Sequence, residues 1–137
     1  MSDGANALWQ AVFDALAADA GIRALLGDPP RIFEHVPDGT AFPCLVSGGG
    51  AALEAGTDTG QGTFHRLVLH VWSRARGMSE ARAIMDAVHA VLHEAALLPP
   101  GRTLTYLRFD GSDVLREADG RTFHGVIRFV GRTEPSG

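Results

Sequence analysis

The pattern of hydrophobic positions predicts a strand followed by a helix in the middle of the chain. In residues 63–72, apolar side chains occupy both alternating sets of positions: Leu67, Leu69 and Val71 on one side, and Phe64, Val68 and Trp72 on the other. Apolar residues on both faces predict a central strand that is covered on both sides, by the helix that follows it on one side and by the N-terminal helix or a neighbouring subunit on the other. In residues 80–96, apolar positions recur at helical spacing and predict an amphipathic helix with one core face.

The flanking segments have weaker patterns of the same two kinds. They predict helices at 5–18 and 20–26, a short extended piece at 31–35, and strands at 42–47, 51–54, 103–109, 114–117 and 121–130. Gly48, Gly49 and Gly50 predict a bend between two of these strands, and Gly111 predicts a bulge. Asp119-Gly120 is a strong hairpin signal.

These elements predict an α+β fold, with a mostly antiparallel sheet of four to five strands against which an N-terminal helix and one long helix pack. The 137 residues predict a single domain, 1–137. Within it, the glycine-rich sequence AGTDTGQG predicts the tip of a flexible hairpin arm at about 48–62. Residues 133–137 are expected to be frayed.

The distribution of charge is uneven along the chain. The formal net charge of −4 divides into −6 for residues 1–62, with eight acids and two arginines, and +2 for residues 63–137, with eight acids and ten arginines. A folded chain of this kind can present one acidic and one mildly basic surface, which suits head-to-tail association or contact with two different partners. Ordinary solvated surface is the alternative interpretation.

Composition excludes several kinds of chemistry. All 12 basic residues are arginine, so the chain has no lysine for a Walker motif, a Schiff base or a Ser–Lys dyad. The single cysteine, Cys44, cannot form an internal disulfide. No apolar run is long enough to cross a membrane, and the first residues lack the basic segment of a secretory signal. The scattered arginines do not indicate a sequence-specific nucleic-acid site.

Two local patterns could carry chemistry, and neither is complete. His89 and His93 have a metal-binding spacing, but Ala90 stands where the zincin pattern needs glutamate, and His93 falls opposite the apolar stripe. Boundary or surface histidines are therefore the favoured interpretation. The Gly48–Gly50 run lacks the residues of a phosphate loop and is interpreted as a bend. We predict no catalytic residue, no metal and no cofactor.

The order of segments resembles a known family. The segments that carry this resemblance are G-D-P-P-R-I-F, x-F-P-C-L-V, F-H-R-L-V-L-H-V-W-S, G-M-S-E-A-R-x-I-M and the final V-I-R-F-V-G-R. The resemblance as a whole covers about residues 4–132. This layout is similar to the tail completion, or tail terminator, proteins of long-tailed bacteriophages and of phage-derived gene transfer agents. The resemblance lies in order and spacing, with the strand, turn and helix of residues 63–94 as its most telling part.

The resemblance implies a structural virion protein and not an enzyme. Such proteins form a ring, usually a homohexamer, at the head-proximal end of the tail tube, stop its growth and offer a joining surface to the neck proteins of the head. The implied partners are further copies of the chain, the tail tube protein and a head–tail connector, with DNA passing through the ring. The implied location is the tail or neck of a virion assembled in the host cytoplasm.

Residues for the subunit and tube contacts are predicted from glycine content and charge. The candidates are Gly48, Gly49, Gly50, Thr57, Asp58 and Thr59 in the arm, and Arg74 and Arg76 in the turn after the central strand. Three alternative functions stay open at this stage: a head–tail connector of the same particle, a small metal-dependent hydrolase built on His89 and His93, and a stand-alone binding domain.

Overall fold

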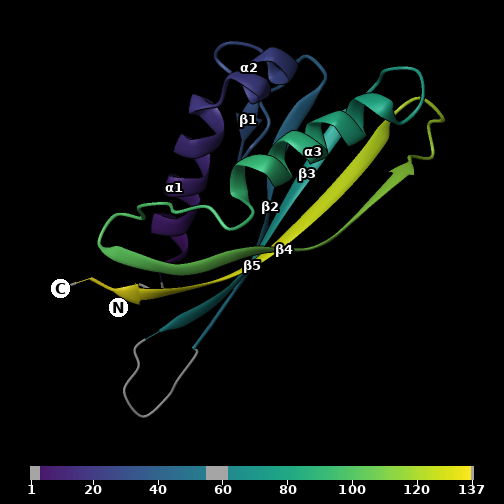
Figure 1. Cartoon of the computed structure of the whole chain (residues 1–137). Helices are drawn as coiled ribbons and strands as arrows, with labels where there is room; N and C mark the ends of the chain where they lie inside the picture. The colour runs from purple at the N-terminus through teal and green to yellow at the C-terminus, as the bar shows by residue number, and fades with distance from the viewer. Residues whose placement is uncertain (1–3, 55–61, 137) are drawn as a thin grey trace.

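The computed structural model describes residues 4–54 and 62–136, which form three helices and five strands (Figure 1). The helices are α1 (Ala5–Ala18), α2 (Ala20–Leu26) and α3 (Ser79–Leu92). The strands are β1 (Ile32–Phe33), β2 (Cys44–Glu54), β3 (Thr63–Ser73), β4 (Arg102–Arg116) and β5 (Phe123–Pro135). The predicted α+β class is confirmed.

The strands form one mixed sheet in the order β1-β2-β3-β5-β4. Only β1 runs parallel to its neighbour, and the other pairs are antiparallel, as the sequence predicts for most of the sheet. The bend predicted at the three glycines is a register shift between Ser47 and Gly50, and the bulge predicted around Gly111 is a shift between Phe109 and Gly111. Both interruptions stay inside continuous strands because pairing resumes directly after them.

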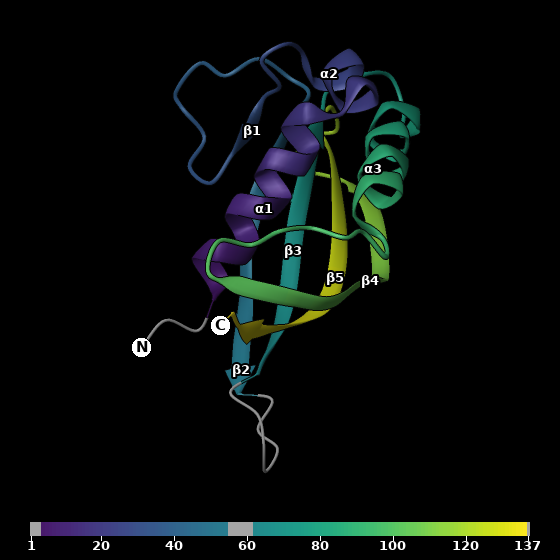
Figure 2. The same ribbon diagram turned by 60° about the vertical axis from the view of Figure 1, so that its left-hand side comes forward.

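Both long helices lie on the same face of this sheet, with α1 over β2 and β3 and α3 over β5 and β4 (Figure 2). The apolar stripe of α1 and that of α3 meet the same row of sheet residues, so Leu69, Val71 and Ile127 are almost completely buried. Asp19 separates α1 from α2 and caps the latter, because its carboxylate accepts a hydrogen bond from the backbone N–H of Ile22.

Of the two covers predicted for the second face of the central strand, the N-terminal helix is wrong, and a neighbouring subunit stays a prediction. In residues 4–54 and 62–136 no helix lies on the second face, because α1 packs beside α3 on the first (Figure 2). The apolar side chains of that second face, such as Val68 and Trp72, are only half-buried. An apolar pattern reports that a face avoids water, and it does not say whether the same chain provides the cover.

Several segment ends also differ from the prediction. The helix predicted for 80–96 ends at Leu92, since Glu94 has a φ of 57° and its backbone N–H bonds instead to the carbonyl of Leu107. The frayed tail predicted at 133–137 is wrong as far as Pro135, because β5 continues to that residue and Thr133 is fully buried. Of the predicted arm, residues 48–54 belong to β2, and 55–61 lie outside the described residues.

None of the described helices combines the length and the apolar character needed to cross a membrane.

Candidate functional site

The second face of the sheet, called the open face below, is the main candidate for a functional surface. Strand pairing assigns its members, because cross-strand partners point to the same side: Trp72 pairs with His124, His70 with Val126, and Arg66 with Val130. Its apolar members on the two central strands are Phe64, Val68, Trp72, Val126 and Val130, and each is half-buried. The face is thus apolar along its middle without being sealed by any described element.

Arginines interrupt this apolar surface and cover parts of it. The guanidinium of Arg66 lies 5.7 Å from the ring centre of Phe64, and that of Arg108 lies 4.4 Å from the ring centre of Tyr106. Arg128 Nη1 lies 3.0 Å from a carboxylate oxygen of Asp113. Long side chains of this kind shield apolar neighbours with their stems while keeping the charge in water. The open face therefore combines apolar contact area with charge, as protein interfaces do.

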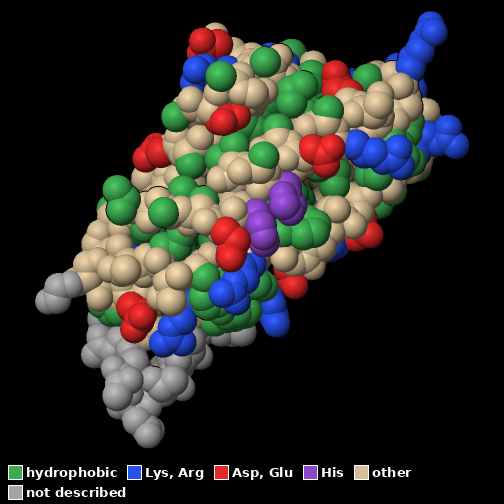
Figure 3. All heavy atoms as spheres, in the orientation of Figure 1, with side chains coloured by type: hydrophobic (Ala, Val, Ile, Leu, Met, Phe, Trp, Pro, Cys, Tyr) green, Lys and Arg blue, Asp and Glu red, His purple; other side chains and the backbone are tan. Residues whose placement is uncertain are grey.

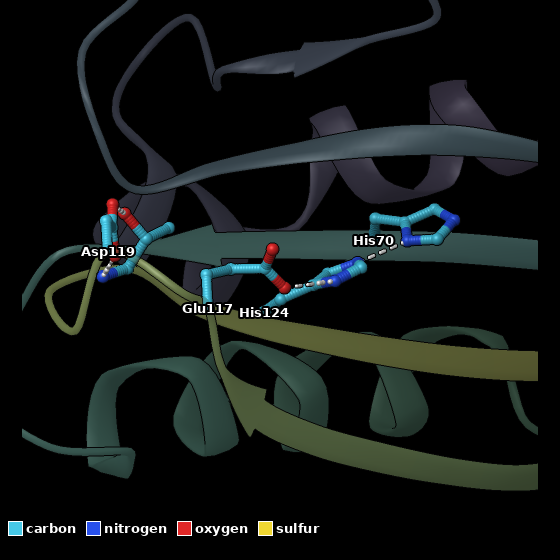
Figure 4. A network of polar contacts seen from close by, with 5 residues as sticks. His70, Glu117, Asp119 and His124 are labelled. Carbon is cyan, nitrogen blue, oxygen red and sulfur yellow. Dashed lines mark hydrogen bonds and ion pairs between the residues drawn. The ribbon is translucent and has the colours of Figure 1, made fainter.

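A ladder of polar side chains crosses the open face between the end of β3 and the start of β5 (Figure 4). His70 Nδ1 lies 2.6 Å from His124 Nε2, and His124 Nδ1 lies 3.3 Å from a carboxylate oxygen of Glu117. The indole ring of Trp72 stacks on His124 with ring centres 3.9 Å apart and planes 8° from parallel. Strands β3 and β5 and the residue after β4 thus contribute to one connected group.

The carboxylate of Glu117 sets the direction of the hydrogen bonds in the ladder, because it can only accept. While His124 is neutral and donates its Nδ1–H to Glu117, its Nε2 accepts a hydrogen bond from the Nδ1–H of His70. The two facing nitrogens cannot both carry hydrogen at 2.6 Å. One hydrogen therefore lies between the two rings.

The surroundings of His70 oppose its protonation. Burial lowers the pKa of His70 below its ordinary value, and the nearby positive charges of His124 and Arg128 lower this pKa further. On the same face, burial raises the pKa of the Cys44 thiol, and the charge of Arg31 opposes this effect only in part. A thiol held protonated is a poor nucleophile, so the ladder and Cys44 do not make an activated nucleophile–base pair.

The histidine pair on α3 is held by contacts inside the chain. The rings of His89 and His93 stack with centres 4.9 Å apart, and the rings of His89 and Phe109 meet edge to face. Nδ1 of His93 accepts a hydrogen bond of 3.0 Å from the backbone N–H of Phe109. Within the described part of the chain, no three His, Cys, Asp or Glu side chains gather as metal ligands would. These contacts fix the end of α3 against β4.

Two of the three glycines predicted for an intersubunit arm have a steric reason to be glycine. A Cβ on Gly48 would run into the imidazole of His70, and a Cβ on Gly50 would run into the backbone carbonyl of Arg66. They let β2 bulge tightly against β3 beside the polar ladder. The other arm candidates, Thr57, Asp58 and Thr59, lie outside the described residues, so their role stays a prediction.

The two arginines of the β3–α3 turn have different surroundings. Arg74 lies over the ring of Phe42, 4.2 Å from its centre, and its Nε donates a hydrogen bond of 3.2 Å to Thr122 Oγ1. This side chain therefore links the start of β2 to the start of β5 within one chain. Arg76 is exposed in the same turn. Of the predicted pair, Arg76 is the better placed to meet another molecule.

Sequence reasoning missed the polar ladder. Alternation in the last strand places His124 on the other face of the strand from Phe123. The Asp119-Gly120 turn brings residues 114–117 beside 121–130. The signal that would join His70 to His124 is the β3–β5 register, which pairs residues more than fifty positions apart. Nothing local in the sequence fixes that register.

Comparison with known proteins agrees with a surface built for assembly. Residues 10–134 match the family described as tail completion protein gp17. A solved structure, "Virion of native gene transfer agent (GTA) particle", contains a similar chain, with 30% sequence identity and a TM-score of 0.87 over 95% of this chain and 96% of that one. No curated protein matches the sequence. Because the family match spans nearly the whole sequence, the chain belongs to the tail completion protein gp17 family and is a structural protein of a phage-type tail.

Proposed function

We propose that this chain is a tail terminator, which assembles as a homohexameric ring on the head-proximal end of the tail tube, stops tube growth and offers the surface that joins tail to head. The observation that carries this proposal is the likeness to a chain of a gene transfer agent virion over 95% of the present chain. Likeness over so much of both chains supports an equivalent place in a particle of the same kind.

The open face supports an assembling role over a catalytic one. Its apolar side chains are only half-buried among the described residues, and apolar surface of this kind is typical of proteins that bury it against a partner. The polar groups on this face are bonded to each other: Arg128 to Asp113, and His124 to Glu117. A rigid, pre-bonded surface suits docking between preformed bodies.

The test is the length of tails made without this protein. Particles from cells that lack the gene should have tails that exceed the wild-type length and carry no head, as seen by negative-stain electron microscopy. Supplying the wild-type gene in trans should restore one uniform length.

A different defect would point to another role. Tails of normal length beside empty or leaking heads would contradict termination and favour a head–tail connector. Normal particles would contradict both roles.

A further inference from the structure

Exposed arginines gather at one end of the molecule, where the β3–α3 turn and the β4–β5 hairpin lie side by side (Figures 1 and 3). Arg76 comes from the turn, Arg82 from the first turns of α3, Arg116 from the end of β4 and Arg121 from the hairpin, and all four are exposed. We call these four side chains the arginine end. It contains a third of the basic residues of the chain.

Acids near the arginine end are mostly engaged within the chain. Glu80 accepts a hydrogen bond of 2.7 Å from Ser73 Oγ, and Glu117 bonds to His124. Asp119 closes the hairpin by accepting hydrogen bonds from the backbone and hydroxyl of Thr122, and it offsets part of the charge of Arg121. Among the described residues, the ion pairs of arginine use Arg23, Arg108 and Arg128, none of which belongs to this end. None of its four arginines therefore has an ion-pair partner among the described residues.

The opposite edge of the sheet presents an acidic segment. The first part of the loop between β1 and β2, residues 34–41, carries exposed Glu34 and Asp38, with the apolar Val36 exposed between them. A turn holds the loop in shape, because Thr40 donates to the carbonyl of Pro37 from both its backbone N–H and its hydroxyl. We call residues 34–41 the acidic loop. No arginine occurs between Arg31 and Arg66 to neutralise it.

Among the described residues no ion pair joins these two charged features within one molecule, although Phe42, just after the loop, packs against Arg74 of the β3–α3 turn. With β1 at one edge of the sheet and β4 at the other, the acidic loop projects from the side opposite to α3 and β4 (Figure 2). The two surfaces are thus free to pair between copies. Two different complementary patches on one subunit give a head-to-tail contact, and such contacts close into a ring when the rotation permits.

We propose that the acidic loop of one copy docks on the arginine end of the next copy, with Glu34 and Asp38 facing Arg76 and Arg116. This contact rests on the ring proposed above and names the surfaces that hold it together. Opposite charges on the two patches set the register and direction of the ring. The exposed Val36 adds a small apolar contact at the centre of the loop.

A second copy fits the arginine end better than nucleic acid does. The chain has a net charge of −4, and the four arginines stand among Glu80, Glu117 and Asp119, so the field around them is mixed. DNA binding of useful strength draws on several neutralised phosphates along one continuous basic surface. The acidic loop offers two carboxylates, which matches a patch of this size.

Charge reversal tests this contact. One variant carries Glu34→Arg and Asp38→Arg, and the other carries Arg76→Glu and Arg116→Glu. Each alone should reduce ring assembly on purified tail tubes by roughly tenfold or more, since two attractive contacts become repulsive. Asp14→Arg, which reverses an exposed acid of α1 outside the loop, is the matched control and should assemble normally.

Mixing the two variants gives the sharpest result. In a mixture, the basic loop of the first variant can dock on the acidic substitutions of the second, and the acidic loop of the second can dock on the arginine end of the first. An equimolar mixture should therefore assemble rings that neither variant forms alone. The variant with all four changes should also recover. Rings are counted by electron microscopy and by native mass spectrometry after release from the tubes.

Three outcomes would overturn the contact. The first is assembly that neither reversal changes, and the second is failure of both the mixture and the fourfold variant. The third is loss of assembly only in the arginine variant, which would point to DNA or another anion at these arginines. If wild-type protein itself forms no ring on tubes, the proposed terminator function fails first.

Discussion

At the scale of single residues, the chain depends on close backbone approaches and on polar groups that bond to each other. Gly50 lies where β2 resumes its pairing, with a φ of 134° and the carbonyl of Arg66 in the space that a Cβ would need. Gly49, one position earlier, has a φ of 81° and open space around it. A substitution at Gly49 therefore tests backbone strain alone, whereas a substitution at Gly50 also creates a steric clash.

Replacement of the two glycines should therefore have unequal effects. Gly49→Ala should lower the free energy of unfolding by about 1 kcal/mol, which is the usual penalty for a side chain in the left-handed region. Gly50→Ala should cost at least about 1 kcal/mol more, since β2 and β3 must separate to admit the methyl group. Urea unfolding followed by circular dichroism measures both values. Equal losses would mean that the register shift is not tightly packed.

The polar ladder makes stability depend on pH. Because the pKa of His70 is lowered in the folded chain, the unfolded chain binds more protons in the window from about pH 6.5 down to the folded value. Stability from this site is present above that window and is lost as pH falls through it. His70→Gln should flatten the dependence of the unfolding free energy on pH between 7 and 5. Identical slopes in the variant and the wild type would contradict this assignment.

At the scale of elements, the two faces of β3 differ in what covers them. Leu69 is fully buried under the helices, whereas its neighbour Val68 lies half-buried on the open face. The alternation of a strand thus offers a matched pair of positions that test the chain's own core and its assembly surface separately.

Aspartate at these two positions should have different consequences. Leu69→Asp should prevent folding, because a carboxylate buried without a partner costs several kcal/mol. Val68→Asp should leave a folded protein, destabilised by about 1 kcal/mol, that is not incorporated into particles. Circular dichroism measures folding, and quantitative immunoblots of purified particles measure incorporation. Normal incorporation of Val68→Asp would mean that the open face stays exposed to water in the virion.

Local patterns predicted the elements well where their causes are local. The helix at 5–18 follows from the spacing of Leu8, Val12 and Leu16, and the break at Asp19 follows from its capping carboxylate. The end of α3 was placed too late because its terminus depends on a hydrogen bond to Leu107, which is distant in sequence. Boundaries set by tertiary contacts cannot be read from a periodic pattern.

The candidate site could be predicted only in outline. The apolar alternation of β3 revealed a face that avoids water, but the side on which α1 packs decides whether that face is core or interface. Arg74 drew attention as a free charge, and the fold uses it to hold Phe42 and Thr122. Charge counts do not distinguish a side chain that is bonded inside the chain from one that is available to a partner.

At the scale of the whole molecule, the uneven charge of the sequence becomes a polarity across the sheet. The acidic N-terminal part supplies α1, α2 and the β1–β2 edge, and the later part supplies α3 and the β4 edge. A subunit of this kind has two unlike sides and one open face. Such a subunit can contact neighbouring copies on its two sides and a further component through the open face.

The position of the protein in the particle tests the account most directly. A cryo-electron microscopy reconstruction of the junction between tail and head should show a ring of this fold on the last layer of the tail tube. In this ring the acidic loop of each copy should lie against the arginine end of the next. Density for the fold at the distal tip of the tail or in the capsid, or a single copy that makes no contact with another, would contradict the account.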